Sequence, residues 1–401
     1  MNGLGVDERM SANGTVHQRA LQAELRSHLP HLTQPLTDCI ARTLTKEITD
    51  SNYVSGEWRT ISIFPMAKRL TAAANSLIFF GAEVSSDPVF LNAALEYPEH
   101  LMETAEVLRL LPSWLAPFVA PYLMRRHRAL KILLDRLTPI VEDRILNFTT
   151  TSENADCIQF FVNAAERKNQ QREWPAQRIV QVLLGIWFAS VHQPAMCLFY
   201  ALDDLCLHPE FTTALREEVC SVINENPHDV SSLPLLNGFL KESARLNPTD
   251  SISLRRKVLR PFTLQDGTTL VKDDIACIPL RPILEDTEIY TDSLTFNPYR
   301  FINDAHLDKA KPGAFATSDF TDADFNFPIW GLGKRACPGR HYASLLLKLV
   351  LAQILLRYDV KMLEDAKQDQ RYFYWRSAIV PKAGATLHFR ERGLEIPTLA
   401  S

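Results

Sequence analysis

The chain has 401 residues, of which 46% are hydrophobic and 22% are charged. This length and composition allow one large core or two medium ones and are typical of soluble globular proteins. The 43 basic and 47 acidic side chains nearly balance at a net charge of −4, which argues against a nucleic-acid partner.

The cysteines and the apolar runs limit the compartment and the topology. Seven cysteines are scattered without a C-x-x-C pair, which indicates reduced thiols in a reducing compartment. Residues 1–14 are polar and do not resemble a signal peptide. The best apolar runs, 179–191 and 345–356, contain polar side chains and fall short of the roughly 18–20 residues that a membrane span needs. We therefore expect buried helices and a protein that is soluble or peripherally attached.

The first part of the chain predicts helices. Leucines recur every three or four positions in residues 15–50, which is typical of one amphipathic helix. Residues 58–150 predict a series of helices, interrupted by prolines at 112, 117 and 121. The basic cluster Arg125–Arg128 is expected to open a helix that runs to about Leu146. This cluster is either a solvated face or a contact with anionic lipid.

A long helix is predicted from about Trp174 to Leu207, with Pro175 in its first turn. Because the segment is apolar on nearly all sides, we expect it to cross the middle of the molecule. Shorter helices are expected at about 208–224 and 234–246.

After residue 250 the sequence pattern changes from helical periodicity to strand-like stretches. Residues 251–282 contain strand-like stretches around a turn at Asp266-Gly267. Residues 283–330 show little periodicity, and a long helix is expected over about 338–359. Residues 371–392 indicate short strands. The whole chain therefore predicts a mainly α protein with a small β region.

The most informative segment is Trp330–Gly339, with the sequence WGLGKRACPG. Its first two glycines permit a tight loop against which a flat cofactor can lie. Cys337 stands where a helix is expected to begin at Pro338, so backbone N–H groups and the helix dipole favour its thiolate. Arg335 offers a cation suited to a carboxylate. Such a thiolate is a strong electron donor to iron.

This segment resembles the signature F-x-x-G-x-R-x-C-x-G of the cytochrome P-450 superfamily, the haem-thiolate monooxygenases. A lone C-x-G would indicate only a buried structural cysteine, but here every fixed position of the signature matches except the first, where Trp330 stands in place of Phe. The resemblance implies that Cys337 is the axial ligand of the haem iron. It also implies that the cofactor contacts include Trp330, Gly331, Arg335 and Gly339.

A second motif supports the resemblance. Glu242 and Arg245 share one helix face, which alone would suggest a surface pair worth a few tenths of a kcal/mol. In the family, an E-x-x-R helix pairs with an arginine from a P-x-R-F-like segment, and here residues 296–301 supply Arg300. The implied role is structural: a buried glutamate, bound by two arginines with good geometry, locks the segment that leads to the haem.

The central helix departs from the family pattern A-G-x-(D/E)-T-(T/S), because residues 189–194 read ASVHQP. Gln193 replaces the alcohol and His192 replaces the acid, the two groups that assist proton delivery in the family. His192 either relays protons, since its pKa lies near neutrality, or only forms a hydrogen bond within the kink expected at Pro194. Both interpretations stay open.

The start of the chain is the second departure, because family members usually carry a membrane anchor and most of the main sheet before this point. We expect a cytochrome P-450-like fold that lacks this N-terminal segment. It would be a single domain over residues 1–401, helix-rich over 15–250 and mixed over 251–401. Strands in 251–282 and 371–392 would then lack partners. The resemblance implies an endoplasmic reticulum membrane surface, although the chain as given has no anchor and would be soluble or cytoplasmic.

The implied reaction inserts one oxygen atom from O₂ into an apolar small molecule at haem b. The helical half resembles fungal members of secondary metabolism, which suggests a terpenoid or polyketide-like pathway. Electrons would come from NADPH through a separate reductase, because the chain has no G-x-G-x-x-G motif. Two alternatives remain: a haem-thiolate enzyme that catalyses a non-oxygenating rearrangement, and a catalytically inactive truncated fragment.

Overall fold

The computed structural model describes residues 16–53, 57–148, 155–225, 233–302, 319–362 and 371–393. Two compact units make up the chain: residues 1–46 with 68–194, and residues 47–67 with 195–401. Helices dominate the described residues, and all described strands belong to the second unit. The prediction of a mainly α protein with a small β region is confirmed.

The helices of the first unit follow the predicted pattern closely. The N-terminal helix over 15–50 is confirmed as α1 (Val16–Arg19), a π-helix η1 (Ala20–Leu25) and α2 (Arg26–Thr49), which continue one another. The following elements are α3 (Ile63–Phe80), α4 (Ala82–Ser85), α5 (Pro88–Arg109), η2 (Ser113–Leu115), α6 (Ala116–Leu123), η3 (Arg125–His127), α7 (Arg128–Leu146) and α8 (Cys157–Arg167).

Local chemistry explains where several of these helices begin. The Asp87 carboxylate caps α5 by accepting from the N–H groups of Val89 and Phe90, and Pro88 needs no such bond. Asp156 caps α8 in the same way. Pro121 lies inside α6 and does not break it, so this part of the prediction is wrong.

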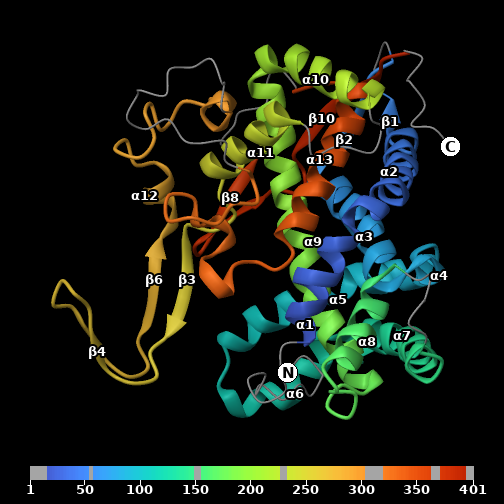
Figure 1. Cartoon of the computed structure of the whole chain (residues 1–401), viewed down its shortest axis with the longest axis vertical. Helices are drawn as coiled ribbons and strands as arrows, with labels where there is room; N and C mark the ends of the chain where they lie inside the picture. The colour runs from blue at the N-terminus through green and yellow to red at the C-terminus, as the bar shows by residue number, and fades with distance from the viewer. Residues whose placement is uncertain are drawn as a thin grey trace. The chain divides into compact units, whose positions relative to one another are not determined.

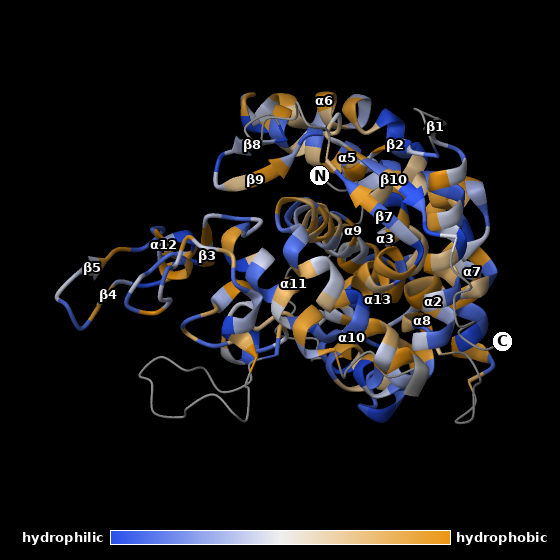
Figure 2. Ribbon diagram, turned by 90° about the horizontal axis from the view of Figure 1, so that it is seen from above, coloured by the Kyte–Doolittle hydropathy of each residue, from blue (hydrophilic) through white to orange (hydrophobic). Residues whose placement is uncertain are grey.

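Helix α9 (Ala176–Leu207) confirms the predicted long helix, with Pro175 directly before it. Its ribbon is largely hydrophobic (Figure 2). Among the described residues it is the one helix long and apolar enough to cross a membrane, and half of its most apolar window is buried. One boundary between the two units falls inside α9, after Pro194.

The second unit is built around α10 (Thr212–Glu225), α11 (Pro234–Leu246) and α13 (Arg340–Arg357), which pack on one another. The predicted helix over 338–359 is confirmed, but it starts two residues later and ends two residues earlier. The chain turns at Pro338-Gly339, and Tyr358 already belongs to a strand. A short helix, α12 (Leu280–Leu284), follows the late β ribbon.

The main sheet of the second unit has the antiparallel order β1-β2-β10-β7. Its strands are β1 (Asn52–Tyr53), β2 (Arg59–Ser62), β10 (Thr386–Glu391) and β7 (Tyr358–Lys361). The sequence predicted helix at β2, which is wrong. Since β10 pairs with β2 on one side and β7 on the other, the expectation that it lacks partners is also wrong.

The other strands form two-stranded ribbons. In Figure 1, β3 (Ile252–Lys257) and β6 (Ile275–Pro279) run side by side and carry a hairpin of β4 (Phe262–Thr263) and β5 (Thr269–Leu270) at their far end. The predicted turn at Asp266-Gly267 connects β4 and β5, and Gly267 has a φ of 89°. A second hairpin pairs β8 (Tyr372–Trp375) with β9 (Ala378–Pro381).

Candidate functional site

The Cys337 loop, residues 328–339, is shaped by backbone hydrogen bonds. Two 3₁₀ turns, η7 (Pro328–Trp330) and η8 (Gly333–Arg335), lead to Cys337. The Cys337 N–H donates to the Trp330 carbonyl at 2.7 Å, and the Ala336 N–H donates to the Gly333 carbonyl at 3.1 Å. These bonds close the loop on itself and fix the backbone of the cysteine.

Two glycines of the Cys337 loop have left-handed backbone angles that other residues rarely adopt. Gly331 has a φ of 76°, and a Cβ there would lie 3.4 Å from the Arg335 carbonyl oxygen. Gly333, which stands at the glycine position of the signature, has a φ of 59°. By contrast, Gly339 has a φ of −90°, and a Cβ there would meet nothing within 4 Å. The structure gives no steric reason for glycine at this position.

The Cys337 side chain is half-buried, and burial raises the pKa of its thiol. The N–H groups of Gly339 and Arg340 and the charge of Arg340 act in the opposite direction, toward the thiolate. Arg340 also donates to the carbonyls of Cys337 and Thr321, both at 2.9 Å. Because α13 begins at Arg340, the expectation that Pro338 is its first residue is corrected. Arg335 is exposed in η8.

Trp330 connects this loop to the preceding segment. Its indole N–H donates to the Phe320 carbonyl at 2.5 Å, and the two rings meet edge to face at 5.1 Å. The Phe320 N–H in turn donates to the side-chain oxygen of Asn237 in α11, at 3.2 Å. The position of Trp330 is therefore tied to α11.

Helix α11 brings Glu242, Arg245 and Arg300 together. Arg245 donates two bonds to the Glu242 carboxylate, at 2.8 and 2.9 Å, and neither side chain is exposed to solvent. Arg300, from η6 (Pro298–Phe301), donates to the same carboxylate at 3.0 Å. The Asn297 N–H adds a fourth bond at 2.9 Å. This geometry satisfies a buried carboxylate on several sides, which a stable buried ion pair requires.

The same arginines also bind loop carbonyls. Arg245 donates to the Leu284 carbonyl at 2.6 Å and lies over the ring of Tyr290, whose hydroxyl donates to the Asn326 carbonyl at 2.9 Å. Arg300 donates to the carbonyl of Thr291 at 3.0 Å. The network therefore reaches both the segment before Arg300 and the segment before Trp330.

In the first unit, Pro194 interrupts the backbone hydrogen bonds of α9, and a neighbouring side chain replaces the lost bond. Pro194 has no N–H, so the Ser190 carbonyl lacks its usual helical donor. The side-chain amide of Asn75 in α3, fully buried, donates to this carbonyl at 2.8 Å. Asn75 thus replaces the missing backbone bond, and α9 continues through Pro194 as one helix. No local sequence pattern points to Asn75.

His192 and Gln193 also belong to the first unit. Burial lowers the pKa of His192, the charge of Lys68 lowers it further, and Glu99 partly opposes them. Lys68 and Glu99 form an ion pair at 2.5 Å. The Nε2 atom of His192 is buried and has no hydrogen-bond partner among the described residues, whereas Gln193 is exposed.

The residues of the Cys337 loop fit a haem group chemically. A cysteine that receives N–H groups is a suitable thiolate donor to haem iron, and the two left-handed glycines keep side chains off the loop. The described residues contain no cluster of three or more His, Cys, Asp or Glu that could hold a separate metal ion.

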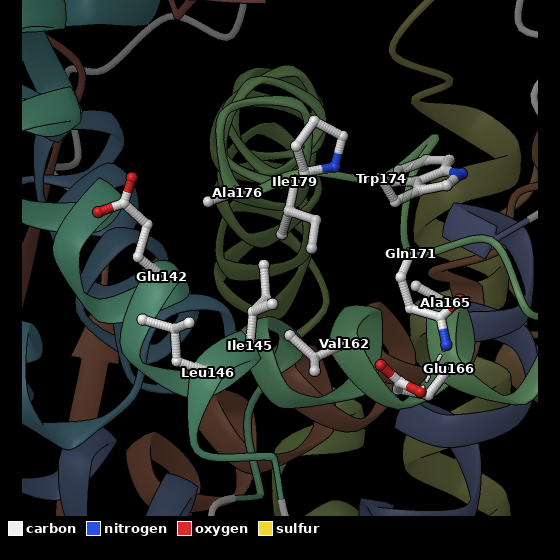
Figure 3. A pocket seen from close by; sticks show the side chains of 11 residues that line it. Glu142, Ile145, Leu146, Val162, Ala165, Glu166, Gln171, Trp174, Ala176 and Ile179 are labelled. Carbon is white, nitrogen blue, oxygen red and sulfur yellow. Dashed lines mark hydrogen bonds between the residues drawn. The ribbon is translucent and has the colours of Figure 1, made fainter.

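A mostly apolar cavity lies elsewhere, wholly within the first unit. It has a volume of about 400 Å³, and side chains from α7, α8 and the start of α9 face one another around it (Figure 3). Its lining is mostly apolar, with Trp174, Glu142 and Glu166 among the larger side chains. None of the predicted site residues lines this cavity.

Comparison with known proteins agrees with this geometry. Residues 3–389 match the family model described as cytochrome P-450. The chain is 29% identical to the cytochrome P-450 monooxygenase paxP of Penicillium paxilli, over 91% of this chain and 73% of that protein. It is 31% identical to an ent-kaurene oxidase of Gibberella intermedia, over 94% of this chain and 71% of that protein.

A solved structure is similar in fold. Retinoic acid-bound cyanobacterial CYP120A1 aligns with a TM-score of 0.70 at 18% sequence identity. The alignment covers 94% of this chain and 78% of the cyanobacterial one.

Proposed function

The chain belongs to the cytochrome P-450 family of haem monooxygenases, and we propose that it oxidises an apolar terpenoid in fungal secondary metabolism. Family membership implies a haem cofactor, a small-molecule substrate, O₂ and a redox partner. The proposed terpenoid class rests on relatives whose name states that they oxidise ent-kaurene. We propose NADPH as the electron source, through a separate reductase.

The observation that carries this proposal is the Cys337 loop. Haem b bound through a thiolate supplies oxygen activation. In this chain Cys337 would provide the sulfur, held by its N–H bond to Trp330, and the N–H groups of Gly339 and Arg340 would stabilise its charge. The exposed Arg335 would pair with a carboxylate of the cofactor.

Glu242, Arg245 and Arg300 have a positioning role in this proposal. Their network binds carbonyls and an N–H group of the loops that precede the cysteine. Because they are engaged with one another and with the backbone, we assign them no proton transfer.

His192 is the candidate for proton delivery, with Gln193 beside it. A pKa lowered by burial keeps the imidazole neutral near pH 7, so that one ring nitrogen holds a proton and the other can accept one. Replacing His192 with Ala should lower the share of consumed NADPH that appears as product and change its pH profile. The matched change Gln193→Ala should have a smaller effect, because that side chain is exposed. Equal coupling in wild type and His192→Ala would remove His192 from proton delivery.

Peripheral membrane contact is the proposed location, at the endoplasmic reticulum surface. Trp114, Phe118 and Tyr122 are each at least 68% exposed, and η3 adds the exposed Arg125 and Arg126 next to them in the chain. Apolar side chains beside basic ones favour the interface of an anionic bilayer. The haem-loaded chain should float with anionic vesicles and less with neutral ones. Replacing Trp114 and Phe118 with Ser should abolish flotation, and unchanged flotation would exclude this surface.

A non-oxygenating rearrangement is the second candidate function, because the central helix has Gln193 where the family has an alcohol. The test is turnover of terpenoid hydrocarbons, ent-kaurene included, with NADPH, a reductase and isotope-labelled O₂. One labelled oxygen atom per product is the expected result. An unlabelled, rearranged product would support the second candidate. No product from any hydrocarbon would overturn the proposed substrate class.

A further inference from the structure

Lys241 has an ionisable side chain that is almost completely buried. It precedes Glu242 in α11 and is 1% exposed. Its ammonium nitrogen lies 4.9 Å from the centre of the Phe301 ring and 4.6 Å from that of Phe327. It also donates to the Asp319 carbonyl at 3.1 Å. A buried lysine needs such partners, because desolvation of the charge is costly.

The partners of Lys241 come from two separate loops. Phe301 directly follows Arg300, and Phe327 directly precedes η7 of the Cys337 loop. The two rings also contact each other, with centroids 6.2 Å apart. The ammonium group of Lys241 therefore contacts both the segment that contains Arg300 and the segment that leads into the Cys337 loop.

Asn237 extends this connection from one turn earlier in α11. Residues four apart share a helix face, so Asn237 and Lys241 point to the same side. Asn237 accepts from Phe320, Lys241 donates to Asp319, and Phe320 in turn holds Trp330. The final bond of this path joins the Trp330 carbonyl to the N–H of Cys337.

We infer that Lys241, together with Asn237, is a positioning residue for the Cys337 loop, acting through Phe301, Phe327 and Trp330. The inference rests on the proposed role of Cys337 as haem ligand. Glu242 and Arg245 bind Asn297, Arg300 and the Leu284 carbonyl. Lys241 and Asn237 instead contact Phe301, Phe327, Asp319 and Phe320. Burial lowers the pKa of Lys241 to about 8, and the carboxylates of Asp322, Asp324 and Asp319 oppose this shift, so the ammonium form prevails near pH 7.

The test compares two buried cations of the second unit. Lys241→Met keeps an unbranched side chain that is one atom shorter, and removes the charge. The control is Arg371→Met: Arg371 is 3% exposed, lies over the ring of Phe199 and pairs with Asp203, neither of which belongs to the Cys337 loop. For each haem-loaded protein, the ferrous carbon monoxide complex gives the ratio of thiolate-ligated to non-thiolate haem. This ratio is followed through a guanidinium titration, with helix content measured in parallel.

Lys241→Met should lower this ratio about tenfold before helix content changes, which corresponds to ~1.4 kcal/mol and suits a desolvated cation–π contact. Arg371→Met should lose thiolate ligation only as the helices unfold. A ratio within twofold of wild type in Lys241→Met, or the same early loss in Arg371→Met, would overturn the inference. Absence of the thiolate complex in the wild type would instead overturn the assignment of Cys337 itself.

A second variant covers the case in which Lys241→Met does not retain haem. Phe327→Leu keeps the charge and removes one ring, and it should lower the ratio about threefold. If both variants load haem, the loss in the double variant should be smaller than the sum of the two single losses, because both changes remove the Lys241–Phe327 contact. An unchanged ratio in Phe327→Leu, or additive losses in the double variant, would overturn the inference.

Discussion

Helix α11 and the Pro194 stretch of α9 satisfy buried polar groups in different ways. In α11, Glu242 and Lys241 engage residues of two segments far along the chain, 297–301 and 319–327. In α9, the carbonyl freed by Pro194 is satisfied by one side chain, Asn75, within the same unit. The first arrangement lets a helix determine where distant loops lie. The second preserves a helix whose sequence departs from the family pattern, without fixing any loop.

The largest expected effect is at the centre that the α11 network supports. Cys337→Ser should abolish the thiolate-type carbon monoxide complex, because a neutral hydroxyl is a far poorer donor to iron. Cys277→Ser, at an exposed position on β6, is the control and should leave the complex unchanged. A thiolate-type complex in Cys337→Ser would mean that another group ligates the iron.

Breaking the α11 network should have the next largest effect. Arg245→Ala leaves Glu242 buried with one cation fewer and should lower the free energy of unfolding by about 3–5 kcal/mol, with loss of bound haem. Arg300→Ala should cost less, because its side chain lies nearer the surface and Arg245 still pairs with Glu242. Arg255→Ala removes an exposed pair with Asp250 and should cost at most about 1 kcal/mol. Denaturant titration measures all three. Equal losses of unfolding free energy for Arg245→Ala and Arg255→Ala would show that the buried network stabilises the protein no more than an exposed ion pair does.

Asp204 lies near the C-terminal end of α9 and contacts Asn247, the residue that follows α11. Burial raises the pKa of Asp204 to about 8, and its carboxyl group accepts from the Asn247 side chain at 3.0 Å. Between pH ~4 and ~8 the folded chain therefore holds a proton that the unfolded chain has released, so stability falls as pH rises, by at most about 1.4 kcal/mol per pH unit. Above pH 8 this contribution is gone.

Asp204→Asn should remove that slope. The measurement is the free energy of unfolding of wild type and variant at several values between pH 5 and pH 8, as the difference between them. A difference that stays constant over this range would show that Asp204 is ionised in the folded protein.

The smallest expected effect concerns the Pro194 stretch. Asn75→Ala should leave the Ser190 carbonyl without its donor and cost about 1–3 kcal/mol of stability. Pro194→Ala restores a backbone N–H that can reach this carbonyl, so Asn75→Ala should cost clearly less in the Pro194→Ala background. Identical costs in both backgrounds would show that Asn75 does not replace the missing bond.

The sequence predicted the Cys337 loop and the long helices because their signals are local. Gly331, the helix after Cys337 and the leucine pattern of residues 15–50 each need only their neighbours in the chain. The four-residue strand β2 was missed because only its pairing makes it a strand, and Thr60 meets His388 at a distance of 328 positions in sequence. Asn75 and Lys241 were missed for a related reason: no local pattern states which distant carbonyl or ring a polar side chain will meet.

The central claim, that Cys337 places a sulfur on haem iron, is tested most directly by X-ray absorption at the iron edge of the haem-loaded chain. The account predicts one sulfur atom in the first coordination shell of the wild type and none in Cys337→Ser. A first shell of only nitrogen and oxygen in the wild type would contradict it.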